Sequence, residues 1–134
     1  MTGVQTCALP ILMDRLRSPG GCPWDAEQSH ESLLKYLLEE SYEFIESVEE
    51  NDRQAMREEL GDLLLQVYFH SRMAEEDKVD PFNVEDVAKV VADKLIRRHP
   101  HVFGDVKVSG TEEDRKSTRL NSSHIPLSRM PSSA

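Results

Sequence analysis

Apolar residues recur at helical spacing in three long stretches of the chain, residues 30–49, 53–76 and 84–98. In each stretch an apolar side chain returns every three or four positions, which places these side chains on one face of an α-helix. Asn51 and Asp52 are turn-forming residues between the first two stretches. The pattern therefore predicts an all-α fold in which the first two helices are antiparallel neighbours joined by a short turn.

The apolar stripes are wide for a chain of 134 residues. They comprise Leu33, Leu34, Leu37, Leu38, Phe44, Ile45 and Val48 on the first helix; Met56, Leu60, Leu63, Leu64, Val67, Tyr68 and Met73 on the second; and Val87, Val90, Val91, Leu95 and Ile96 on the third. A single chain has few layers with which to cover them. We therefore expect an antiparallel helical bundle that is completed by a homodimer.

The segments around these helices are short and irregular in pattern. Residues 12–17 predict a helical turn or two, and residues 18–23 predict a loop because they contain two prolines and two glycines. Asp25 or Ser29 is expected to cap the first long helix. Residues 101–113 are expected to be irregular.

The two ends of the chain resemble translated sequencing-adapter DNA rather than folded protein. Residues 114–124 can be encoded by a DNA string whose reverse complement encodes residues 2–11. We therefore interpret residues 1–11 and 114–134 as non-native, the latter as a disordered tail, and residues 12–113 as the domain. Cys7 and His124 are left out of functional reasoning for this reason.

Composition excludes several classes of protein. A net charge of −9 argues against a nucleic-acid binder, because phosphate contacts need a basic surface. No apolar run approaches the length of a membrane span, and no signal peptide is evident, which favours no membrane partner and a cytoplasmic location. The two cysteines form neither a disulfide framework nor a zinc-binding spacing.

Paired carboxylates carry the candidate chemistry. Glu40 and Glu43 lie three apart on the first helix, and Glu59 and Asp62 lie three apart on the second, so each pair shares a helix face. A short turn brings the two pairs to similar heights, where four like charges would repel one another unless a divalent cation bound them. The alternative is a solvated acidic helix face, since Glu is a good helix former.

Three further features are candidates for substrate contact. Lys94, Arg97 and Arg98 form a basic cluster suited to phosphate oxygens, or one that merely complements the dipole at a helix C-terminus. Trp24 is expected either to stack on a nucleobase or to plug the core. Lys35 either reaches a phosphate or is solvated.

The chain resembles the MazG family in four motifs that occur in the family's order. These are LRSPGGCPWDAEQSHESL, EESYE, ELGD and DKLIRRHPHVFGD, and the resemblance covers essentially all of residues 12–105. The carboxylate motifs also occur in all-α dUTPases, dCTPases and phosphoribosyl-ATP pyrophosphohydrolases. GCPWDAEQ together with RRHPHVFGD is more specific to MazG proteins.

The resemblance implies Mg²⁺-dependent hydrolysis of nucleoside triphosphates to monophosphate and pyrophosphate, with Mn²⁺ as a possible substitute. It implies that Glu40, Glu43, Glu59 and Asp62 are metal ligands, with Glu39 beside them as a further ligand or as the base for the attacking water. It also places the Lys94–Arg98 stretch at the substrate phosphates. Two alternatives remain open: a narrower dUTP- or dCTP-type pyrophosphatase, and a catalytically weak helical module for dimerisation or regulation.

Overall fold

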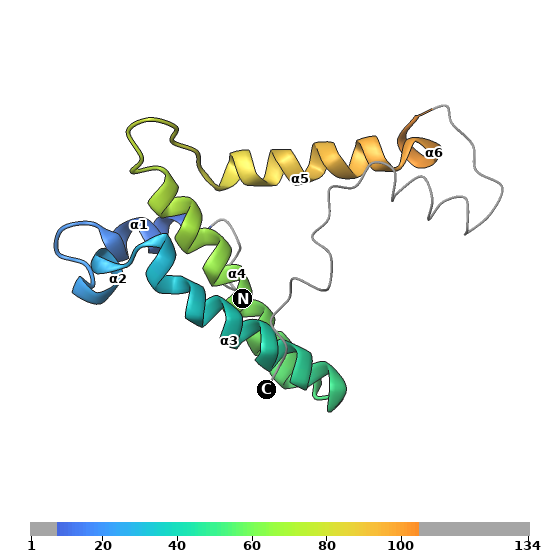
Figure 1. Ribbon diagram of the computed structural model, residues 1–134, viewed down its shortest axis with the longest axis horizontal. Coiled ribbons are helices and arrows are strands. Elements are labelled where there is room, and N and C mark those ends of the chain that lie inside the picture. The colour runs from blue at the N-terminus through green and yellow to red at the C-terminus, as the bar shows by residue number, and fades with distance from the viewer. Residues whose placement is uncertain (1–7, 105–134) are drawn as a thin grey trace. The chain divides into compact units, whose positions relative to one another are not determined.

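The computed structural model describes residues 8–104, and this part of the chain contains helices and no strand. The helices are α1 (Leu9–Arg17), α2 (Pro23–Glu27), α3 (His30–Glu49), α4 (Arg53–Ala74), α5 (Val84–Arg98) and α6 (Pro100–Phe103) (Figure 1). The predicted all-α class is confirmed. The helices predicted over residues 30–49 and 84–98 are confirmed at both ends, and the one predicted over 53–76 ends at Ala74.

Three short segments differ from expectation. Helix α1 begins at Leu9, so the last residues of the segment interpreted as non-native are helical together with residues 12–17. Helix α2 begins at Pro23, the last residue of the predicted loop, and covers residues for which no helix was predicted. The prediction that residues 101–113 are irregular is wrong for its beginning, because Pro100 starts the short helix α6. Cys7 and the 114–134 tail lie outside the described residues.

Local hydrogen bonds define where α3 and α4 begin. The Ser29 hydroxyl accepts from the backbone N–H of Ser32, and the Ser32 hydroxyl accepts from the backbone N–H of Ser29, which closes a capping box at the start of α3. The Asp52 carboxylate accepts from two backbone N–H groups in the first turn of α4. Between the helices, Asn51 has a φ of 56°, a left-handed conformation that Asn tolerates. The two helices consequently run antiparallel and side by side (Figure 1).

A small core lies where α1 packs against α4 and the beginning of α3. Met13, Leu33, Phe69 and Met73 are buried together, with Tyr36 and Tyr68 packed against them. Most of the other predicted core positions are exposed within this chain. On α3 and α4 the exposed apolar residues are Leu34, Leu38, Ile45, Val48, Leu60, Leu64, Leu65 and Val67. These positions are uncovered within the single chain because helical periodicity identifies an apolar face without identifying what covers it.

The chain divides into two compact units, of which the first ends at Val87 and the second begins at Ala88. In the second unit Val90, Val91, Leu95 and Ile96 are exposed rather than inward as predicted. Between residues 8 and 104, no helix is long and apolar enough to cross a membrane.

Candidate metal centre

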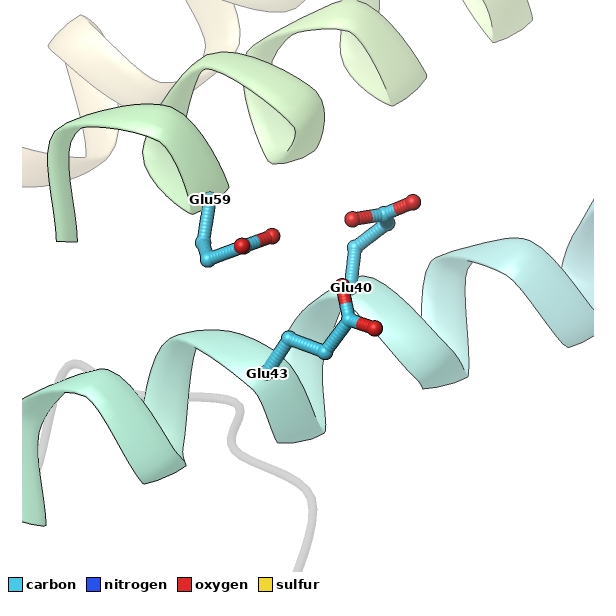
Figure 2. A group of neighbouring side chains, drawn as sticks. All are labelled: Glu40, Glu43 and Glu59. Atoms are coloured by element: carbon cyan, nitrogen blue, oxygen red, sulfur yellow. The ribbon is translucent and has the colours of Figure 1, made fainter. Parts of the chain in front are cut away.

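Three carboxylates meet in the seam between α3 and α4. Glu40 and Glu43 extend from α3 and Glu59 from α4, and Figure 2 shows the three side chains directed toward one another. One carboxylate oxygen from each lies within 4.8 Å of the other two. The predicted convergence of Glu40, Glu43 and Glu59 is therefore present in the fold.

The turn between the helices accounts for this convergence. Glu43 lies six residues before the end of α3, and Glu59 lies six residues after the start of α4. At a rise of about 1.5 Å per residue, both side chains stand roughly 9 Å from the turn. Glu40 lies one helical turn further along the same face of α3. Equal spacing from a short turn thus places the carboxylates at the same level of the helix pair.

Burial and mutual repulsion perturb the carboxylates. Burial, followed by the charges of Asp62 and Glu43, raises the pKa of Glu40 to about 7. Burial and the charge of Glu43 also raise the pKa of Glu59 above its ordinary value. Each ionised carboxylate raises the free energy of ionising its neighbours. The cluster therefore disfavours ionisation of all its carboxyl groups when no cation is bound.

The donor set fits a hard divalent cation. Among the described residues, the enclosed Glu59 Oε2 has no hydrogen-bond partner, and its neighbours are carboxyl groups that can donate only when protonated. An enclosed oxygen without a donor is costly, and a cation removes both this deficit and the repulsion among the charges. Oxygen-only ligands from carboxylates are the set that Mg²⁺ and Mn²⁺ prefer.

The two remaining carboxylates of the predicted site lie at its margin. Asp62 is exposed and lies outside the close triad, but its charge is the largest electrostatic contribution to the raised pKa of Glu40. Its carboxylate is thus electrostatically part of the cluster. Glu39 is exposed on α3 beside Glu40, one residue around the helix and outside the triad.

Trp24 and Lys35 gather around Tyr36, a residue that the sequence analysis did not single out. The Trp24 and Tyr36 ring centroids are 5.8 Å apart in an edge-to-face arrangement, and Lys35 Nζ lies 4.9 Å from the centre of the Tyr36 ring. Trp24 is 49% exposed, so it does not plug the core. Tyr36 precedes Glu40 by one helical turn, and that spacing was the available signal that the two share a face.

The basic candidates Lys94, Arg97 and Arg98 lie on α5 in the second unit, near the end of that helix. Lys94 and Arg98 are half-buried and four residues apart, whereas Arg97 is exposed. Lys94 and Arg98 thus share a helix face, as the sequence predicted.

The described part of the chain is thus an all-α protein with a carboxylate cluster between two antiparallel helices that could hold a divalent cation. The protein-family model of the MazG nucleotide pyrophosphohydrolase domain matches residues 28–103 of the sequence. This range includes every predicted site residue except Trp24. The chain belongs to the MazG family.

Individual relatives support this membership. The chain is 56% identical over 97 residues to a protein of Thermotoga maritima named nucleoside triphosphate pyrophosphohydrolase/pyrophosphatase MazG, covering 72% of this chain and 37% of the relative. It is 46% identical over 106 residues to the nucleoside triphosphate pyrophosphohydrolase of Escherichia coli K12, covering 78% and 40%. The chain thus spans about two fifths of the length of these curated relatives.

A solved structure shows the same fold. The crystal structure of a mazG-related protein from Thermotoga maritima superposes with a TM-score of 0.68 and 30% sequence identity, covering 87% of this chain and 97% of that one.

Proposed function

We propose that the chain catalyses Mg²⁺-dependent hydrolysis of nucleoside triphosphates to a nucleoside monophosphate and pyrophosphate. The observation that carries the proposal is the convergence of Glu40, Glu43 and Glu59 in a member of the MazG family. Both relatives described above carry names for this activity.

The chain's carboxylates supply the metal-binding part of the proposed reaction. In this proposal Glu40, Glu43, Glu59 and Asp62 would hold Mg²⁺, which when bound would neutralise phosphate charge and polarise the reacting groups. Water attacks the α-phosphorus, a new P–O bond forms, and the bond to the pyrophosphate oxygen breaks. Glu39 accepts the proton from this water, because it is exposed to solvent beside the ligand Glu40.

Basic and aromatic side chains are the proposed contacts to the substrate. Lys94, Arg97 and Arg98 bind the phosphates, since a guanidinium matches phosphate oxygens and offsets charge on the leaving pyrophosphate. Lys35 adds a cation one turn before Glu39. Trp24 offers its exposed ring to the nucleobase, with Tyr36 supporting it from the side. The proposal includes a cytoplasmic location.

The test is pyrophosphate release from a panel of ribo- and deoxyribonucleoside triphosphates, with Mg²⁺, with Mn²⁺ and with EDTA. Glu43→Gln and Asp62→Asn remove ligand charge at nearly constant shape, and we expect each to lower turnover at least about a hundredfold. Glu46→Gln, an exposed carboxylate on the same helix, is the matched control and should retain wild-type turnover. Wild-type turnover in Glu43→Gln contradicts the ligand assignment.

The panel also separates the alternatives. Broad release across bases supports the general activity, whereas release confined to dUTP or dCTP supports the narrower pyrophosphatase. A folded chain that releases no pyrophosphate from any nucleotide supports the helical module for dimerisation or regulation.

We further propose that the chain forms a homodimer through the exposed apolar faces of α3 and α4. Leu34, Leu60 and Val67 are between 43% and 56% exposed. Contiguous exposed apolar surface of this kind is unusual on a monomeric protein in water. Sedimentation equilibrium gives the mass directly. A dimer that dissociates on Leu60→Lys supports the proposal, and a monomeric wild type at micromolar concentration contradicts it.

A further inference from the structure

Arg17 lies at the end of α1, and its side chain makes several contacts while almost fully buried. Its side chain is only 7% exposed. Nε and NH2 donate to the two carboxylate oxygens of Glu76, at 2.8 and 2.9 Å, and Glu76 lies just beyond the end of α4. This forked pair raises the pKa of Arg17 and lowers that of Glu76, as expected for a strong charge-assisted interaction.

The remaining guanidinium nitrogen holds the segment that carries Trp24. NH1 donates to the backbone carbonyls of Asp25, at 2.6 Å, and Gln28, at 3.2 Å. These carbonyls lie at the C-terminal end of α2, where the Asp25 carbonyl also accepts from the backbone N–H of Gln28 at 3.4 Å. Helix α2 has five residues, too few to be stable alone, so this anchoring matters for its position.

A second bridge ties the same segment to α3. The Gln28 side chain donates through Nε2 to the Trp24 carbonyl at 2.8 Å, and its Oε1 accepts from the Ser32 hydroxyl at 2.8 Å. Gln28 therefore has both ends of its amide engaged within the protein. The Trp24 ring then meets the edge of Tyr36, one turn before Glu40.

We propose that Arg17 is a positioning residue for nucleotide binding: it clamps α2 to the end of α4 and thereby holds Trp24 on Tyr36, on the face of α3 that leads to the carboxylates. The inference rests on the proposed function, in which Trp24 contacts the nucleobase. Arg17 itself touches neither metal nor substrate. Losing the clamp loosens Trp24 and weakens nucleotide binding, while the chemistry at Glu40, Glu43 and Glu59 is retained.

The experiment compares Arg17→Lys with the wild-type chain. A lysine keeps the charge but cannot form the forked pair and reach the two carbonyls together. We expect KM for the best nucleoside triphosphate to rise about tenfold, equivalent to roughly 1.4 kcal/mol, with kcat and the Mg²⁺ dependence unchanged. Arg15→Lys, an exposed arginine on the same helix, is the matched control and should leave KM unchanged.

Fluorescence gives a readout that does not depend on turnover. Trp24 is the only tryptophan of the chain, so all tryptophan emission reports its surroundings. We expect acrylamide to quench this emission more strongly in Arg17→Lys than in the wild type, with an unchanged far-ultraviolet circular dichroism spectrum. Glu76→Gln removes the charge from the other side of the clamp and should shift both KM and quenching in the same direction, which keeps the test open if Arg17→Lys fails to fold.

The outcomes separate this inference from the proposed function. Unchanged quenching in both folded variants overturns the inference, and so does a rise in KM that Arg15→Lys reproduces. A fall in kcat at constant KM also overturns it. A wild-type chain that releases no pyrophosphate overturns the proposed function by itself, and the quenching data still decide whether Arg17 holds Trp24.

Discussion

Replacing Glu40 by glutamine should stabilise the metal-free fold while abolishing its response to metal. Glutamine keeps the shape of the side chain and removes the carboxyl group, whose pKa is raised from 4.5 to about 7. At about 1.36 kcal/mol per pKa unit, the unfavourable ionisation of Glu40 amounts to at most roughly 3 kcal/mol. Because Glu40 is only half-buried and water screens its neighbours, we expect a gain on the order of 1–2 kcal/mol.

The size of this effect depends on pH. The folded chain binds the Glu40 proton more tightly than the unfolded chain, so ionisation lowers the free energy of unfolding as the pH rises from about 4.5 to about 7. Glutamine cannot ionise and escapes this loss. The advantage of Glu40→Gln should therefore be absent below the lower pH and complete above the upper one.

Urea denaturation followed by circular dichroism in EDTA measures the difference at both ends of this pH range. Glu46→Gln is the matched control, since Glu46 is exposed on the same helix and outside the cluster. Adding Mg²⁺ should then raise the stability of the wild type and leave Glu40→Gln unchanged. An equal gain at both pH values, or an equal gain in Glu46→Gln, refutes the reasoning.

Three other perturbations have defined outcomes. Leu33→Ala should cost about 2–5 kcal/mol in urea denaturation because Leu33 is 1% exposed, whereas Leu12→Ala on α1, at 47% exposed, should cost far less. Asp52→Ala should cost about 1 kcal/mol by removing the cap of α4, and no loss of stability on denaturation would contradict that cap. Mg²⁺ at about a hundred times its dissociation constant should add roughly 2.7 kcal/mol to the free energy of unfolding, and Asp62→Asn should reduce that gain.

The long helices and the carboxylate site were predictable because both depend on local rules. Ser29 and Asp52 are strong N-cap residues, which mark where α3 and α4 begin. The spacing of apolar residues along each helix then identifies its apolar face. Once a short turn joins two helices, residues equally far from the turn lie at similar heights, and those that flank the facing apolar stripes lie near the seam. The approach of Glu43 to Glu59 follows from the height together with the helical face.

Other features depend on contacts between distant parts of the sequence. The partner of Arg17 is Glu76, 59 residues away, so no local pattern indicates the clamp or the short helix α2 that it anchors. The exposure of Leu60 and Val67 has a related cause. Periodicity shows that a helix has an apolar side, but the neighbour that covers that side is a property of the assembled molecule.

The turn at Asn51 makes the carboxylate site sensitive to chain length. Adding one residue between Glu49 and Arg53 would rotate α4 by about 100° relative to α3 and shift it along its axis, since a helix turns once in about 3.6 residues. Glu59 would then leave the seam although every ligand remained in the sequence. Insertions and deletions in this turn should therefore inactivate the site as effectively as loss of a ligand, whereas the loop between α4 and α5 lies beyond the last ligand and can vary in length without changing this register.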